Sequence, residues 1–553
     1  MEKRALLAAA LTIGLLLLYQ VLFPPVPPSP PEAPPVERKA PPTPEAPAPP
    51  SALAAAARPA PAPPRTVTVE TPAYRAQVGS DGGRLLEWML RYRGDKPMIV
   101  PGSLGSRGLS LQRSQRGPEP LAFEVKTDRL VLGPDRLRGE LALVAEDSFG
   151  MRVVEALRFE AGDFGVEVQI KLENRHSVPQ VVEVLLPWST LEKWPEGEAE
   201  KFQGQRPTRV VSLTSNGLQR AGFADVTGAT VEGGWIGLES EWYIVALLPQ
   251  SPGFKLVTTR DPDGHVEVAL KATPPPLAPG QNWEGRARVY IGPKEYNRLK
   301  ALGVGLEDAI DFGGFPLPRK YGGLPMGWFA VPILWLMNFF YSYVPNYGVA
   351  IILLTVITKI LFFPLTVKSM ASMKAMQTLQ PQINALRAKY QKDSQRLQRE
   401  TMELYRKHKV NPMGGCLPML VQVPIFYALY LVFSLSVELQ NAAFLCFGTI
   451  FGRALWVCDL AQYDPTYVLP ILMGISMFVQ QKMTPTVGDP TQAKIMLLMP
   501  VVFTFMFLNL PSGLVLYWFV SNVLQILQQY YMNRATKRSG GTAKKEAGEG
   551  TRP

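Results

Sequence analysis

The sequence is poor in the residues that usually carry chemistry. Its 553 residues include only three histidines and three cysteines, which are widely spaced: His176, His265, His408, Cys416, Cys446 and Cys458. No CxxC pair occurs, so zinc and thiol-redox sites have little support. A phosphate-binding glycine loop, a nucleophile elbow and a carboxylate dyad are also missing. We therefore expect no metal and no cofactor, and no hydrolytic or covalent catalysis.

What the chain does contain is a set of long apolar runs. Crossing a bilayer takes about 20 residues, and each run comes close to that length. The runs are Ala5–Phe23, Tyr347–Val367, Met413–Val437, Tyr467–Met483, Ile495–Leu510 and Gly513–Tyr531. The pattern predicts a polytopic α-helical membrane protein with six transmembrane helices, five of which form a core over residues 345–533.

The N-terminus differs from a cleaved signal peptide. Residues 1–23 have a short basic start and an apolar run, but bulky residues such as Leu22 and Phe23 end the run where a cleavage site needs small ones. We expect an uncleaved signal anchor. Residues 24–65 follow as a linker with 18 prolines between 24 and 64. This composition predicts an extended spacer or a plain disordered linker.

Residues 66–318 alternate between apolar and polar side chains in short segments, as half-buried strands do. The segments are Thr66–Thr71, Phe123–Thr127, Val153–Phe159, Val166–Leu172, Val181–Leu186, Tyr243–Leu248, Val266–Ala269 and Ala287–Ile291. Turn signals such as Asp81-Gly82-Gly83 separate them. The pattern predicts a large two-sheet β-sandwich, closed by a helical stretch near Pro293–Ala309.

Residues 326–344 are rich in aromatic side chains, including Trp328 and Trp335. Trp and Tyr favour the membrane–water boundary, so we expect an interfacial amphipathic helix on the outer surface. A further transmembrane span is the alternative, and Pro332 argues against a straight one.

The basic residues orient the predicted spans. Net charge is +11, and residues 368–412 hold ten Lys or Arg against three acids, whereas 438–466 hold one. The tail 534–553 holds six more. Cytoplasmic loops carry an excess of Lys and Arg. We therefore expect both termini in the cytoplasm of a bacterial inner-membrane protein and residues 24–345 in the periplasm.

Lys359 lies well inside an apolar run, where burying a charge costs at least a few kcal/mol. We expect it to face a polar cavity within the bilayer. The polar and aromatic residues expected to line this cavity with it are Thr355, Thr358, Gln422, Tyr517, Trp518, Ser521 and Asn522. The alternative is that the lysine stem extends to the cytoplasmic edge of the membrane.

The basic loop 368–412 shows apolar residues three and four apart, which predicts a helical hairpin. Met370, Met373, Met376 and Tyr390 form the row that we expect to contact clients, because flexible thioether side chains adapt to varied apolar surfaces. The alternative is an ordinary packed seam between two helices.

Several stretches are specific enough to suggest a family. They are Pro364–Thr366, Leu379–Pro381, Asn411–Pro418, Gln422–Phe426, Ser436–Leu439, Asp464–Tyr467, Leu469–Gly474, Gln481–Pro485 and Pro511–Tyr517. With these the chain resembles the YidC/Oxa/Alb membrane protein insertases, closely over residues 326–533. Residues 66–318 resemble, less specifically, the periplasmic β-supersandwich of Gram-negative members. The family usually has Arg where Lys359 stands.

The resemblance implies a non-enzymatic insertase and chaperone for nascent membrane proteins. It would act alone or with the Sec translocon, through a polar groove open to the cytoplasm. The hairpin would receive clients, with ribosome or signal-recognition components as further partners. The basic tail would contact ribosomal RNA or anionic lipids, or serve only as a topology determinant.

Two rival functions and one covalent question stay open from the sequence. A solute transporter or channel would often show repeats between its spans, and none is seen here. An enzyme acting on carbohydrate would need an acid/base pattern around His176 or His265, and none is recognisable. Cys446 and Cys458 share one outer loop, where they are either disulfide-bonded or free.

Overall fold

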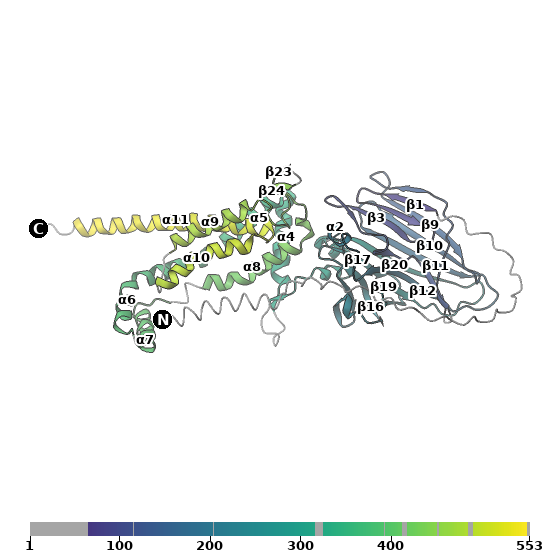
Figure 1. The fold of residues 1–553 in the computed structure, drawn as a ribbon, viewed down its shortest axis with the longest axis horizontal. Helices are drawn as coiled ribbons and strands as arrows, with labels where there is room; N and C mark the ends of the chain where they lie inside the picture. The colour runs from purple at the N-terminus through teal and green to yellow at the C-terminus, as the bar shows by residue number, and fades with distance from the viewer. Residues whose placement is uncertain are drawn as a thin grey trace, which may run out of the picture.

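The computed structural model describes residues 65–549 apart from 114–115, 203, 316–323, 392, 412–416, 451–452 and 485–489. The predicted anchor 1–23 and almost all of the linker 24–65 lie outside the described residues. The described chain forms two parts: a β-domain and a bundle of helices that extends from one end of it (Figure 1).

The β-domain contains three sheets. The largest has eight strands in the order β14-β13-β16-β17-β20-β11-β10-β9. Its strands are β9 (Arg138–Glu146), β10 (Met151–Glu160), β11 (Gly165–Asn174), β13 (Arg209–Thr214), β14 (Gly217–Gly222), β16 (Gly233–Glu239), β17 (Tyr243–Pro249) and β20 (Asn282–Pro293). All seven pairings along this order are antiparallel.

Two further sheets accompany it, one of seven strands and one of five. The seven-stranded sheet contains β15 (Ala229–Val231), β18 (Phe254–Arg260), β19 (His265–Ala272), β12 (Glu183–Leu191), β6 (Ser110–Arg113) and β7 (Arg116–Pro120), with β5 (Leu104–Ser106) also on β12. The five-stranded sheet contains β4 (Asp95–Pro97), β3 (Leu85–Arg91), β2 (Tyr74–Gly79), β1 (Thr66–Glu70) and β8 (Arg129–Val131). Short helices α2 (Glu198–Lys201), η1 (Phe223–Asp225), α3 (Tyr296–Ala301) and η2 (Leu306–Ala309) complete the β-domain.

Seven of the eight predicted strands are confirmed, and so is the helical stretch near Pro293–Ala309. The prediction of a strand at Phe123–Thr127 is wrong. This segment makes only an isolated bridge, between Glu124 and Val144. Phe123 and Val125 are nevertheless buried. Their alternation with exposed neighbours therefore reflects packing onto the core and not a ladder of backbone hydrogen bonds.

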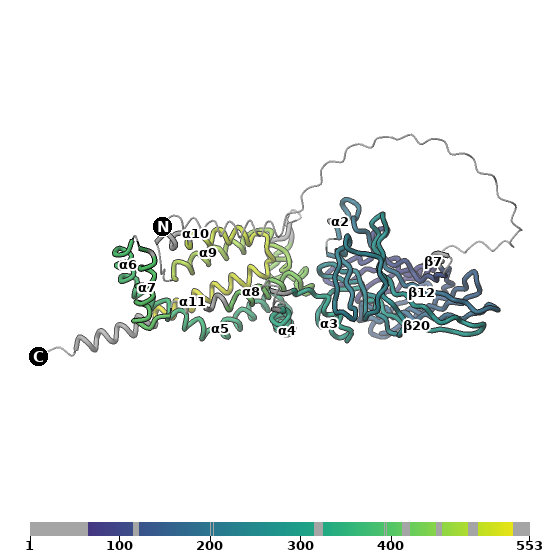
Figure 2. Tube along the Cα trace, turned by 90° about the horizontal axis from the view of Figure 1, so that it is seen from below, coloured from purple at the N-terminus to yellow at the C-terminus, as the bar shows by residue number. Residues whose placement is uncertain are grey.

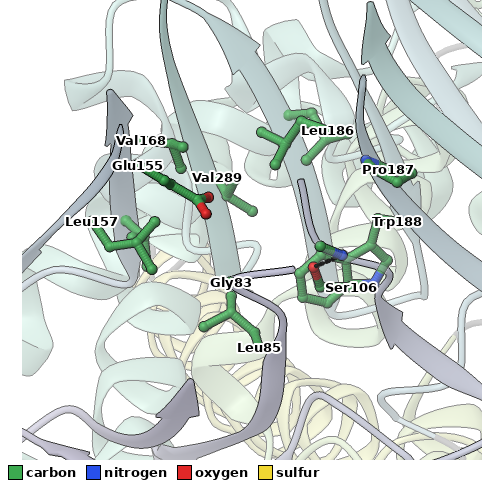
Figure 3. A pocket seen from close by; sticks show the side chains of 13 residues that line it. Gly83, Leu85, Ser106, Glu155, Leu157, Val168, Leu186, Pro187, Trp188 and Val289 are labelled. Atoms are coloured by element: carbon green, nitrogen blue, oxygen red, sulfur yellow. Dashed lines mark hydrogen bonds between the residues drawn. The ribbon is translucent and has the colours of Figure 1, made fainter. Parts of the chain in front are cut away.

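One core position of the β-domain carries a carboxylate. Glu155 lies two residues from each of the buried residues Val153 and Leu157 along β10, so all three side chains are on the face of the strand that points into the core. Figure 3 shows it pointing into a pocket beside Gly83, where a Cβ would collide with the carboxylate. Oε2 of Glu155 has no hydrogen-bond partner among the described residues. Burial raises the pKa of Glu155 to about 8.

The second part of the chain is helical. Its helices are α4 (Gly327–Tyr343), α5 (Tyr347–Thr378), α6 (Gln380–Lys389), α7 (Ser394–Lys407), α8 (Leu417–Leu435), α9 (Val468–Met483), α10 (Pro490–Phe507) and α11 (Ser512–Glu549). A small strand pair, β21 (Gly314–Phe315) with β22 (Leu324–Pro325), precedes α4. The turn η5 (Val437–Leu439) and the strand pair β23 (Leu445–Ile450) with β24 (Arg453–Val457) lie between α8 and α9.

Helices α5, α8, α9, α10 and α11 lie where the sequence predicts the second to sixth spans. Within the described residues, α5 alone passes a length-and-composition test for crossing a membrane, and Val421–Leu435, Val468–Met483 and Met496–Phe507 are shorter apolar helices. The number of spans therefore stays a prediction. The predicted second span, Tyr347–Val367, lies within α5, which continues without a break through Pro364 to Thr378. The end of the span at Val367 stays a prediction.

The packing order within the bundle runs from α4 through α5, α11 and α9 to α10. Helix α5 packs against α4 and α11, and α11 packs against α9, which packs against α10. The pair α6 and α7 lies at the end of the bundle remote from the β-domain (Figure 2). Ile360, Leu361 and Phe505 are 67%, 69% and 69% exposed. Large apolar side chains on the outside of helices are expected where lipid and not water surrounds them.

The cysteine question is settled by a disulfide between Cys446 and Cys458, which joins β23 to the residue after β24. We expect it to survive purification, so that a bulky maleimide adds at most once to the denatured, unreduced chain and up to three times after reduction. Cys446→Ser should remove the cross-link and destabilise the hairpin by about 2–3 kcal/mol. Equal adduct numbers with and without reduction would contradict the pairing.

Candidate functional site

The side chain of Lys359 has a polar partner on another helix. Lys359 is half-buried on α5, and its Nζ donates a hydrogen bond of 3.1 Å to Oε1 of Gln525 on α11. The two residues are 166 positions apart. A lysine within an apolar helix is thus held by a neutral amide oxygen, and no acidic residue among those that the structure describes forms an ion pair with it.

Lys359 also lines an open pocket of about 290 Å³ between α5 and α11. The other lining residues are Val356, Ile360, Phe363, Pro364, Leu524 and Gln528. Gln528 is the second polar residue of this set, and its Nε2 is buried with no hydrogen-bond partner in the described part of the chain. The pocket is therefore lined by one amine-bearing residue among mostly apolar walls, and the unused amide donor of Gln528 is buried beside it.

The direction of the lysine stem follows from the way the two helices run. Gly513, near the start of α11, lies against Ile351 near the start of α5, so the helices are parallel. Thr358 lies beside Tyr517 of α11, and its hydroxyl donates to the carbonyl of Thr355. Lys359 follows Thr358 directly, yet it meets Gln525, about 12 Å further along α11. The stem thus extends toward the end of the bundle remote from the β-domain. Lys359 thus lines a pocket, as in the first alternative, and its stem extends along the helix axis, as in the second.

The remaining groove candidates fall into separate environments. Thr355 is fully buried and its hydroxyl donates to the carbonyl of Ile351. Asn522 donates to Oγ of Ser476 on α9, and Ser521 beside it is buried. These polar contacts fill the interior between α5, α9 and α11.

Two candidates do not join this group. Trp518 packs edge-on against Phe426 and Phe507, with ring centroids 4.6 and 5.1 Å apart. It therefore belongs to an aromatic cluster between α8, α10 and α11. Gln422 is exposed on α8.

The methionine row of the hairpin is not an exposed surface. Met370 and Met376 are buried, and Met373 and Tyr390 are half-buried. Met370, Met373 and Met376 also lie on the extended α5, not on a separate hairpin helix. This placement fits the packed seam at least as well as a client surface. Met402 on α7 is 45% exposed and is the more accessible methionine.

Sequence reasoning missed the partners of the site, namely Gln525, Gln528, Gln529 and Ser476. A signal was present, since Asn522, Gln525 and Gln529 are spaced by three and four and so share one face of a helix. The amide of Gln529 donates to the carbonyl of Met483 on α9. No group of three His, Cys, Asp or Glu among the described residues is placed to hold a metal.

Comparison with known proteins gives two family models that together cover most of the chain. The model described as the YidC periplasmic domain matches residues 66–336, and the model described as the 60Kd inner membrane protein matches residues 339–539. The boundary between the two matches falls inside α4 (Gly327–Tyr343).

Full-length relatives agree. The membrane protein insertase YidC of Syntrophus aciditrophicus is 38% identical over 569 residues, which cover 97% of this chain and 100% of that protein. That of Geobacter sulfurreducens is 39% identical over 559 residues, with 97% and 99% covered. A crystal structure of YidC from Thermotoga maritima is 16% identical, covers 84% of this chain and 99% of that one, and superposes with a TM-score of 0.30, which is too low to support an argument. The chain belongs to the YidC family of membrane protein insertases.

Proposed function

We propose that this protein inserts nascent membrane proteins through the pocket that contains Lys359. The observation that carries the proposal is the Lys359–Gln525 contact, which holds a cation inside a span at an opening between α5 and α11. A polar client segment would cross the bilayer partly beside this cation and the amide of Gln528, which lowers the cost of leaving water. Acidic client residues would pair with Lys359. Partition of the client's apolar segment into lipid supplies direction.

The proposal includes a topology. The basic segments 368–412 and 534–553 support cytoplasmic termini under the positive-inside rule. The disulfide between Cys446 and Cys458 supports a periplasmic location for its loop, because disulfides persist in oxidising compartments. We assign residues 24–345 to the periplasm, with 66–318 as the periplasmic domain, 326–344 as an interfacial helix and 345–533 as the insertase core. The Sec translocon, the ribosome and anionic lipids are the proposed partners.

Reconstitution of the purified full-length protein into liposomes tests the function. A small two-span client is added during synthesis, and protection of its connecting loop from external protease is measured. We expect protection in these vesicles and little in protein-free ones. Flux of ions or small solutes without client protection would contradict the proposal and favour the transporter or channel.

Gln525→Leu should lower the insertion rate by about fivefold, because the ammonium of Lys359 loses its hydrogen bond and its fixed position. The protease-protection assay measures this rate. Leu527→Ala is the matched control, since Leu527 lies two residues away and is exposed on the outside of α11. Equal rates for the wild type and Gln525→Leu would show that the amide does not position the lysine.

A further inference from the structure

The periplasmic domain makes a cluster of hydrogen bonds with one short segment of the helical core. This segment, residues 434–441, includes the end of α8 and the turn η5. It lies at the junction of the two parts of the molecule (Figure 1). We call it the docking segment.

Three hydrogen bonds join the docking segment to the periplasmic domain. Nε1 of Trp242 donates to the carbonyl of Ser434 over 3.0 Å. The hydroxyl of Tyr243 donates to Oε1 of Gln440 over 2.6 Å.

The third comes from another turn of the domain. Nδ2 of Asn441 donates to the carbonyl of Arg93 over 3.0 Å. The turn that follows β3 and the turn that precedes β17 thus both contact the docking segment.

Glu438 lies at the centre of this contact. It is 3% exposed, and its Oε1 has no hydrogen-bond partner within the described ranges. A buried carboxylate without full pairing destabilises the state that buries it.

The charged and titratable groups that face Glu438 come from three elements. They are Tyr92 and Arg93 after β3, Glu295 before α3, and Tyr347 at the start of α5. The Arg93 guanidinium lies over the ring of Tyr347, at 5.2 Å from its centroid. Glu295 is paired with Arg298 at 3.2 Å. Arg93 is therefore the cation that stabilises the ionised carboxylate of Glu438, whereas Glu295 is a second acid near Glu438.

Burial raises the pKa of Glu438 to about 7. Glu295 adds to this increase, whereas Arg93 and the backbone N–H groups of Glu438 and Tyr296 oppose it. Undocking would return the carboxyl to water and to its ordinary pKa of 4.5. Docking is then strongest below pH 4.5, weakens as the pH rises from 4.5 to about 7, and is constant above that.

We propose that this junction is a proton-dependent latch, in which protonated Glu438 holds the periplasmic domain on the end of α8 and deprotonation loosens it. The latch gives the periplasmic domain control over the position of one helix of the core. It responds to the pH outside the membrane, where Glu438 is placed in the proposed topology.

Hydrogen exchange of the full-length protein in nanodiscs tests the latch. The amides of Leu439 and Gln440 donate to the carbonyls of Ser436 and Val437 within the docking segment, and the amide of Ser436 donates to Val432 just before it, so all three report on the segment. After correction with an unstructured peptide of the same sequence, we expect their protection to fall by up to about tenfold per pH unit between pH 5 and 7, and to level off by pH 8.

Variants separate the latch from a plain structural contact. Glu438→Gln should keep the protection seen at pH 5 and remove its pH dependence. Glu295→Gln should shift the levelling point to lower pH, and Arg93→Gln should shift it to higher pH. Trp242→Phe is the control, because it removes one hydrogen bond and should lower protection equally at every pH. Wild-type protection that is independent of pH, or an unchanged pH dependence in Glu438→Gln, would overturn the proposal.

Discussion

Lys359→Ala is expected to lower the insertion of clients with acidic translocated segments by about tenfold or more. The substitution removes the cation of the pocket between α5 and α11, and hydrogen bonds to charged groups contribute about 1.5–3 kcal/mol. Protease protection of the client loop in reconstituted vesicles measures the effect. Clients whose translocated segment lacks acidic residues should be affected less, because only the desolvation of the polar backbone is then at stake.

Two companion variants define what the charge does. Lys359→Arg should retain activity, since Arg keeps its charge in nearly every environment. Lys368→Ala is the matched control, because Lys368 lies nine residues further along α5 and is exposed. Wild-type insertion of every tested client by Lys359→Ala would mean that the cation is unnecessary.

The sequence predicted the elements of this protein better than their contacts. Apolar runs mark helices because twenty apolar residues have few other solutions, and α5 begins at Tyr347 as predicted. The asparagine before it accepts a hydrogen bond from Val349 N–H, which is a common helix start. The helix continues past the predicted end of the span at Val367, because the next residues are also good helix formers and Pro364 is accommodated inside the helix.

Only one half of the Lys359–Gln525 pair could be predicted from the sequence. Lys359 stands out in any hydropathy profile, whereas Gln525 is 166 residues away and becomes its partner only through the packing of α5 on α11. Trp518 shows the same limit, because its environment also depends on packing between helices. Its position in a polar-looking stretch suggested the groove, but three aromatic residues from α8 and α10 enclose its ring.

The sequence shows Glu155 within a predicted strand, but the pattern of candidate residues did not include it. It stands at the centre of the predicted strand Val153–Phe159, on the same side as apolar residues that alternate with period two. Alternation alone therefore placed a carboxylate in the core. What alternation could not show is that Oε2 of this carboxylate lacks a hydrogen-bond partner among the described residues, since the pocket wall comes from β3, β11, β12, β17 and β20 and the loops beside them.

Glu155→Gln is expected to stabilise the periplasmic domain at pH 8 and to change little at pH 5. The folded state raises the pKa of Glu155 from 4.5 to about 8, so it binds more protons than the unfolded state between these values. Its contribution to stability is complete below pH 4.5 and is lost as the pH rises to about 8. The loss amounts to at most about 5 kcal/mol. Thermal unfolding of the full-length protein should place the variant's Tm about 10 °C above that of the wild type at pH 8.

The control separates this carboxyl from the general effect of removing an acid. Glu124→Gln removes an exposed carboxyl from the same domain and should leave Tm close to the wild type at both pH values. Because the glutamine at 155 cannot ionise, the gap between it and the wild type must widen with pH and close again near pH 5. A constant gap, or a variant less stable than the wild type at pH 8, would mean that Glu155 is satisfied in the folded state by a water or ion bound in the pocket of Figure 3.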